Sequence, residues 1–154
     1  MNTGQSDQSQ DADMLQTCNY GLGRTPGGGM TLAEYTATFA TWSILASQMI
    51  ISANLSEVAA HHPDCLSLVT NPEIIAINQD PAGLPPRQIY KHVNGVAERT
   101  SGARIGDGDI TQAFSRPLHD GTVACVLLNR GDAATNMSVC MWSCMWSWTV
   151  GYGS

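Results

Sequence analysis

The spacing of apolar residues changes once along this chain, close to Pro86. From Met30 to about Pro86 they recur at three- and four-residue steps, which is the spacing of one helical face. From Arg87 onward they alternate in part with polar residues, as in half-buried strands. The 154-residue chain is therefore predicted to hold a helix-rich α/β part followed by an antiparallel β part.

Three helix starts are visible in the first part. Thr31 and Glu34 fit a capping box, in which each side chain satisfies a backbone amide of the other residue. Pro63 and the triplet Asn71–Glu73 mark two further starts, and Asp80-Pro81 ends the last helix. The apolar residues expected to be buried on these helices are Leu32, Tyr35, Phe39, Trp42, Leu45 or Ala46, then Cys65, Leu66, Leu68 and Val69, then Ile74, Ile75 and Ile77.

Strands are predicted in both parts. Residues 49–54 are rich in β-branched side chains and indicate one buried strand between helices, as in a parallel sheet. The second part contains a hairpin signal, His119-Asp120-Gly121. The antiparallel strands expected there cover residues 88–93, 110–116, 123–128 and 136–139.

Composition excludes several functions. The net charge is −6 and Lys91 is the only lysine, so a nucleic-acid partner and adhesion to an acidic membrane are not expected. No apolar run reaches the length of a membrane-spanning helix, and the first ten residues do not form a secretory signal. Two N-glycosylation sequons begin at Asn54 and Asn136, and they matter only if the chain enters the secretory pathway.

The five cysteines leave their pairing open. Cys65 and Cys125 lie in apolar runs and are predicted to be small core residues, although disulfides remain possible. The four histidines do not fall at zinc-ligand spacing from the cysteines, so neither a metal nor a cofactor is expected. His61-His62 is interpreted as a solvated end of a helix. A tandem Cys-Met-Trp-Ser repeat fills much of residues 140–154 and is interpreted as a repetitive tail rather than a redox or metal site.

The best candidate for chemistry is the carboxylate pair Asp11 and Asp13, which lies in a loop before a helix. Two carboxylates at this spacing can bind a metal or sugar hydroxyls, but they can equally be solvated loop acids. The chain has no Gly-x-Ser-x-Gly, phosphate-loop or dinucleotide-binding motif at a suitable place.

A resemblance favours the sugar-binding interpretation. The residues that carry it are Asp11–Leu15, Gly28–Thr31, Phe39–Ser47, Ile51–Leu55 and Thr70–Pro81, then Phe114–Leu118, Asp120-Gly121 and Val126–Gly131. In this order they resemble the α-galactosidases of glycoside hydrolase family 27, also called melibiases. The stretch from Asn71 to Pro81 is highly specific, and the match extends from about Asp11 to Val139.

The resemblance implies a fold and a division of the chain. Residues 11–83 would be the last segment of a (β/α)8 barrel, with residues 49–54 as its eighth strand. Residues 84–139 would be part of a C-terminal antiparallel β sandwich. Residues 1–10 would be an unmatched polar leader and residues 140–154 the repetitive tail.

The resemblance also implies an activity and site residues. The family hydrolyses terminal α-D-galactosyl residues of oligosaccharides or glycoconjugates by a retaining mechanism that uses two aspartates. Both aspartates lie upstream of the matched region, so no catalytic residue is assigned in this chain and it is expected to be inactive alone. Asp13 matches an aspartate that hydrogen-bonds the sugar, and Met14 lines the same pocket. Family members are typically secreted, lysosomal or vacuolar, and a full-length parent could be a homodimer.

Two alternatives stay open. The β part could form a non-enzymatic carbohydrate-binding or interaction module, for which the tail tryptophans Trp142, Trp146 and Trp148 are the candidate sugar-stacking residues. The chain could also be a non-functional remnant. As a barrel piece it would leave Leu32, Phe39, Trp42 and Ile50 without apolar partners.

Overall fold

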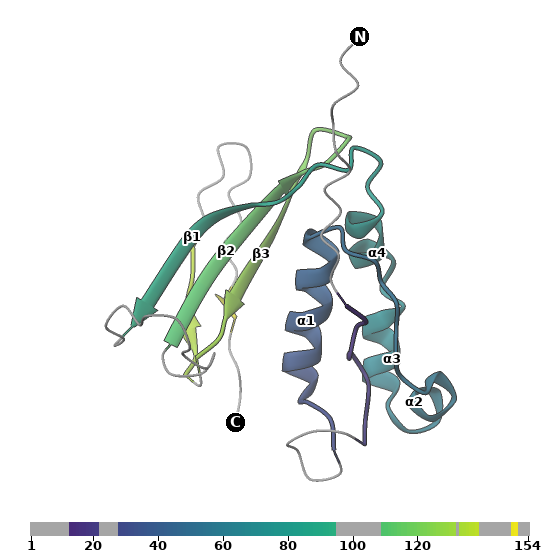
Figure 1. Cartoon of the computed structure of the whole chain (residues 1–154). Coiled ribbons are helices and arrows are strands. Elements are labelled where there is room, and N and C mark those ends of the chain that lie inside the picture. The colour runs from purple at the N-terminus through teal and green to yellow at the C-terminus, as the bar shows by residue number, and fades with distance from the viewer. Residues whose placement is uncertain (1–12, 22–27, 95–108, 132, 139–148, 151–154) are drawn as a thin grey trace. The chain divides into compact units, whose positions relative to one another are not determined.

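A computed structural model describes residues 13–21, 28–94, 109–131, 133–138 and 149–150. The chain clusters into two units, one formed by residues 1–86 with 116–124, and one formed by residues 87–115 with 125–154. The helices of the described residues are α1 (Leu32–Ile44), α2 (Leu55–His61), α3 (Pro63–Val69) and α4 (Pro72–Asn78). The strands are β1 (Arg87–Asn94), β2 (Asp109–Pro117), β3 (Val123–Asn129), β4 (Thr135–Asn136) and β5 (Thr149–Val150) (Figure 1).

Helix α1 begins and ends with complete caps. The Glu34 amide donates to Thr31 Oγ1 over 3.3 Å, and the Glu34 carboxylate accepts from the Thr31 amide over 2.8 Å, which confirms the predicted capping box. At the other end, Ala46 has a left-handed φ of 54°. Its amide and that of Ser47 bond back to the last turn of α1, so the chain reverses directly after the helix.

The core of the first unit lies between α1, α2, α3 and the segment around Leu15. Its buried side chains are Leu15, Cys18, Tyr35, Phe39, Val58, Cys65 and Val69. Helix α1 packs against α3 and α4, as Figure 1 shows. Tyr35 and Phe39 occupy the predicted stripe, whereas Leu32 is 43% exposed. The expectation that Phe39 lacks apolar partners is wrong, because α3 and the Leu15 segment cover it.

The other helices follow their sequence signals with two differences. Asn71 Oδ1 accepts from the amides of Glu73 and Ile74, so the predicted start of α4 is confirmed. The isoleucines of α4 are half-buried rather than buried. Helix α2 was not predicted from the sequence. It starts at an Asn54 cap and buries Val58. It ends at an exposed His61, as interpreted from the sequence.

The predicted strand at residues 49–54 is present as a single parallel bridge between Ile51 and Leu15. Its description as a buried strand is wrong, because Ile50 is 53% exposed and Ile51 half-buried. Only the face toward α1 is covered by described residues, and a parallel strand is buried on both faces only when a layer packs on each side. The order Leu15, α1, Ile51 is nevertheless the strand–helix–strand order expected of a parallel sheet.

Strands β1, β2 and β3 form an antiparallel sheet in that order (Figure 1). The β1–β2 register pairs Arg87 with Ser115 and Asn94 with Asp109, and it shifts between Gln88 and Tyr90. The predicted hairpin between β2 and β3 is confirmed by a hydrogen bond from the Leu118 amide to the Thr122 carbonyl. Cys125, predicted to be a core residue, is exposed instead because its side chain falls on the outer face of β3.

Several predictions fall outside the described residues. They concern the leader, Asp11, the tail residues 140–148 and 151–154, and the end of the predicted strand at Val139. Strand β4 (Thr135–Asn136) overlaps that predicted strand only at Asn136, and it pairs antiparallel with β5. Among the described residues, no helix combines the length and the apolarity needed to cross a bilayer.

Candidate functional site

Asp13 and Met14 open the first described segment. Both side chains are exposed. Asp13 Oδ1 accepts a hydrogen bond from the Met14 amide over 2.7 Å, and the Asp13 carbonyl oxygen accepts from Trp42 Nε1 of α1 over 3.2 Å. The backbone of Asp13 is therefore held by α1, while its carboxylate keeps acceptor capacity toward solvent.

The next residue, Leu15, connects this segment to residues 50–52, which run parallel to it. The Leu15 amide donates to the Ile50 carbonyl over 2.8 Å, and the Ser52 amide donates to the Leu15 carbonyl over 3.2 Å. Ser52 Oγ donates to the same carbonyl over 2.8 Å. Because strand side chains alternate, Leu15 points into the core while Met14 and Ile50 are more than half exposed on the opposite face. The exposed residues around this bridge, Asp13, Met14 and Ile50, are together called the Met14 surface.

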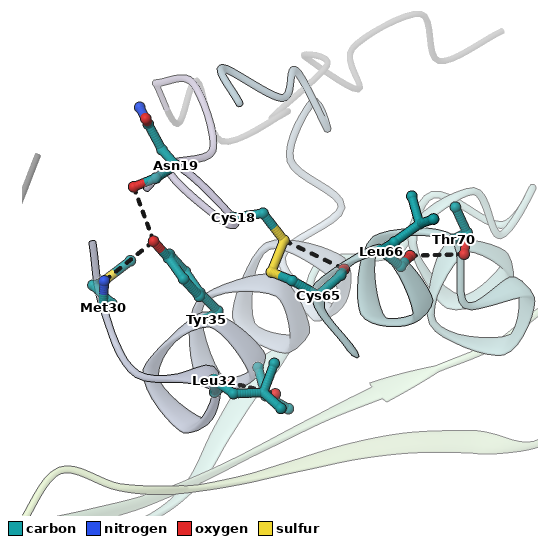
Figure 2. Close-up of a disulfide and its surroundings, with 9 residues drawn as sticks. Cys18, Asn19, Met30, Leu32, Tyr35, Cys65, Leu66 and Thr70 are labelled. Atoms are coloured by element: carbon teal, nitrogen blue, oxygen red, sulfur yellow. Dashed lines mark hydrogen bonds between the residues drawn. A yellow bond between two sulfur atoms is a disulfide. The ribbon is translucent and has the colours of Figure 1, made fainter. Parts of the chain in front are cut away.

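A disulfide fixes the far end of the same segment. Cys18 and Cys65, 47 residues apart, are joined with their Cα atoms 5.9 Å from each other (Figure 2). Sequence reasoning left the pairing of the cysteines open and did not identify this pair, although it placed Cys65 correctly in the core. Cys18 also has a left-handed φ of 63°, which turns the chain sharply after the bridge. Both sulfurs lie in the buried cluster, so the link is part of the core.

Tyr35 contacts both the residues that follow the disulfide and those that precede α1. Its hydroxyl donates to the Asn19 carbonyl over 2.9 Å and accepts from the Met30 amide over 3.1 Å, as Figure 2 shows. Tyr20 stacks on His62 with ring centroids 3.6 Å apart. The pKa of Tyr20 is raised above its usual value, mainly because the ring is partly buried and to a lesser extent because of electrostatic interactions with Tyr35 and Asp64. These contacts hold the Asn19–Tyr20 segment and leave the Met14 surface exposed.

A second polar cluster lies at the β2–β3 hairpin. Asp80 accepts hydrogen bonds from the Ala82 amide, the His119 amide and His119 Nδ1, the last over 2.7 Å. Burial acts to raise the pKa of Asp80, but these bonds outweigh it and hold the pKa below its usual value. In the same turn, bonds from the hydroxyl and amide of Thr122 lower the pKa of Asp120. With three donors on it, the Asp80 carboxylate fastens the hairpin to the end of α4.

Neither cluster provides complete hydrolytic machinery. Among the described residues there is no group of three histidine, cysteine, aspartate or glutamate side chains that could hold a metal ion. Retaining glycoside hydrolysis needs two carboxyl groups flanking one bond. The Met14 surface offers one exposed carboxylate beside apolar side chains, which can bind a sugar through a hydroxyl and an apolar face. It can contribute to a sugar site without performing the chemistry.

Sequence relatives agree on one kind of enzyme. The α-galactosidase of Lachancea cidri is 35% identical over 111 residues, which are 72% of this chain and 22% of that protein. Alpha-galactosidase 3 of Arabidopsis thaliana is 31% identical over 120 residues, which are 78% of this chain and 22% of that protein. The chain is an α-galactosidase homologue. It spans about a quarter of the length of such relatives, and no family model matches it.

Solved structures show the same relationship. The α-galactosidase of Saccharomyces cerevisiae matches this homologue with a TM-score of 0.64 and 27% identity, over 82% of this chain and 24% of that one. A putative α-galactosidase/melibiase of Bacteroides fragilis matches with a TM-score of 0.60 and 25% identity over the same shares. The mixed α/β arrangement of the homologue thus corresponds to part of an α-galactosidase structure.

Proposed function

We propose that the protein acts in the hydrolysis of terminal α-D-galactosyl residues by a retaining mechanism, and that this chain supplies part of the sugar site. Asp13 accepts hydrogen bonds from galactosyl hydroxyls, and Met14 lines the same pocket. The observation that carries the proposal is the exposed carboxylate of Asp13. The backbone of Asp13 is held by a hydrogen bond from Trp42, and the next residue, Met14, is exposed as well.

The chemistry of the Met14 surface suits a neutral sugar. A charged acceptor forms stronger hydrogen bonds to hydroxyls than a neutral one does, which favours orientation of the ring. The exposed side chains of Met14 and Ile50 offer apolar area to the C–H face of the ring. A yeast α-galactosidase structure that contains raffinose, an α-galactoside, matches 82% of this chain with a TM-score of 0.62. This relationship supports raffinose as the probe.

The bond-breaking step belongs to two carboxyl groups that the matched residues do not include. In a retaining mechanism one carboxylate attacks the anomeric carbon, and the other protonates the leaving oxygen and then activates water. Asp13 orients the sugar in this scheme and takes neither role. We therefore expect the 154-residue chain to bind an α-galactoside weakly and to hydrolyse none.

The proposal is tested by titrating the isotope-labelled chain with raffinose and following backbone amide signals by NMR. Sucrose is the matched control sugar, because it is raffinose without the galactosyl unit. Asp13→Asn is the test variant, and Asp64→Asn changes another exposed aspartate of the same unit. We expect raffinose, but not sucrose, to shift the amides of Asp13 and Met14.

Loss of one charge-assisted hydrogen bond should weaken binding of Asp13→Asn by about 10-fold or more. Asp64→Asn should bind raffinose as the unchanged chain does. Equal responses to raffinose and sucrose, or equal affinities of the two variants, would remove Asp13 from the sugar site.

A further inference from the structure

We infer that Asn136 carries an N-linked glycan. The sequon is Asn136-Met137-Ser138, and nothing in the sugar site proposed above depends on it. A sequon alone is a weak signal, because such triplets arise by chance. The structure adds two independent observations, one on the geometry of the triplet and one on a disulfide in the core of the first unit.

The geometry concerns the exposure of the three residues of the triplet. Asn136 ends β4, where it pairs with Thr149 of β5, and its side chain is exposed. Met137 is 8% exposed, whereas Ser138 is exposed again. Asn136 and Ser138 are thus both exposed to solvent, with the buried Met137 between them. A bulky glycan on the Asn136 amide nitrogen therefore extends into solvent without displacing a core side chain.

The redox observation is the disulfide between Cys18 and Cys65. Its two cysteines are buried in the core cluster, so the covalent link is built into the fold of the first unit. Core disulfides of this kind form and persist in oxidising compartments and are rare in the cytosol. N-glycans are attached in the oxidising lumen of the secretory pathway. The disulfide therefore places the chain where an accessible sequon is modified.

The second sequon, Asn54-Leu55-Ser56, provides the internal comparison. Asn54 Oδ1 accepts from the Glu57 amide over 3.4 Å and caps α2. Leu55 and Ser56 already belong to the first turn of that helix, so this triplet is not extended. The side-chain oxygen of Asn54 caps a helix, whereas Asn136 ends the short strand β4 and its side chain is exposed. We therefore assign the glycan to Asn136.

The first experiment uses protein purified from the cells that make it. Trypsin separates the two sequons, because Asn136 lies in the peptide that begins at Gly131 and Asn54 in the peptide that begins at Thr25. Release of N-glycans by a peptide amidase in heavy-oxygen water converts a glycosylated asparagine into isotope-labelled aspartate. We expect the label at Asn136. An Asn136 peptide that is unmodified before and after the amidase overturns the inference.

Variants secreted from a eukaryotic host locate the site a second way. Asn136→Gln and Ser138→Ala should each abolish the amidase-dependent shift in electrophoretic mobility, and Ser138→Thr, which preserves the sequon, should keep it. Asn54→Gln is the matched control and should also keep the shift. A shift that persists in Asn136→Gln and disappears in Asn54→Gln overturns the assignment. A change in galactoside binding would concern Asp13 and would not bear on this result.

Discussion

Arg116 donates from Nη1 to the carbonyl oxygen of Ile77 over 2.8 Å, in the last turn of α4. The same nitrogen lies 3.4 Å from the carbonyl oxygen of Ser43, in the last turn of α1. Carbonyls at helix C-termini lack intrahelical partners and carry the negative end of the helix dipole. The fully buried Arg116 thus joins two helix ends, although its Nε and Nη2 have no hydrogen-bond partner among the described residues.

Replacing Arg116 with methionine tests this junction. The methionine keeps an apolar stem of similar length but removes the charged donor from two helix ends. We expect the free energy of unfolding to fall by about 1–3 kcal/mol, the usual cost of losing a hydrogen bond that involves a charged group. Urea denaturation measures it, with the exposed Arg130→Met as a control expected within about 0.5 kcal/mol of the unchanged chain. Equal stability of Arg116→Met and the unchanged chain would show that the junction is not needed.

Asp80 makes stability depend on acid pH. Its pKa in the folded chain is held below the usual value by His119 and Ala82, so the fold favours the ionised carboxylate. The contribution is fully present above the unfolded-state pKa of about 3.9 and is lost as pH falls through the lower folded-state pKa. Denaturation of the unchanged chain and of Asp80→Asn should therefore differ near neutral pH and converge below about pH 4. A difference that is constant over this range would contradict the assignment. Asp120 titrates in the same direction in both proteins, so the comparison isolates Asp80.

Most of the secondary structure could be predicted from local sequence signals. The Thr31–Glu34 capping box and the Asn71 cap are encoded within four residues, and both appear where the sequence placed them. Helix α2 was missed because Leu55 and Val58 are too few to establish a period. Residues 49–54 were predicted to be buried, but burial of both faces needs a second layer of structure packed on the strand. A composition rich in β-branched residues does not show whether that layer is present.

The candidate site likewise has parts that the sequence indicated and parts that it did not. The resemblance directed attention to Asp13 and Met14, and the structure finds both side chains exposed. Their supports are non-local: Trp42 reaches back to the Asp13 carbonyl, and Cys65 lies 47 residues beyond its partner Cys18. With five cysteines in the chain, spacing alone could not choose this pair. The fastening of Asp80 to His119 likewise depends on tertiary approach between distant residues.

The Cys18–Cys65 disulfide should stabilise the first unit. Closing a loop of 47 residues restricts the unfolded chain, and removing such a link typically costs about 2–4 kcal/mol. The double variant Cys18→Ser with Cys65→Ser should unfold at lower urea by a corresponding amount. Hydrogen exchange at the Leu15 and Asn19 segment should accelerate more than in α1, because the segment loses its covalent anchor. A reducing agent should destabilise the unchanged chain and leave the double variant unaffected. Equal responses of the two proteins would show that the bridge does not form.

Gly29 and Gly121 form a matched pair for testing the Tyr35 contact. Both have a left-handed φ, 88° and 84°, so alanine at either position carries a similar backbone cost of about 1–2 kcal/mol. A Cβ at Gly29 would lie 2.5 Å from Tyr35 Oη, whereas one at Gly121 would have nothing within 4 Å. Gly29→Ala should therefore be less stable than Gly121→Ala by a further 1–3 kcal/mol or so, a typical cost of overpacking. Combining Gly29→Ala with Tyr35→Phe, which removes the obstructing oxygen, should recover part of that excess. The packing explanation fails if the two alanine variants lose the same stability in urea denaturation.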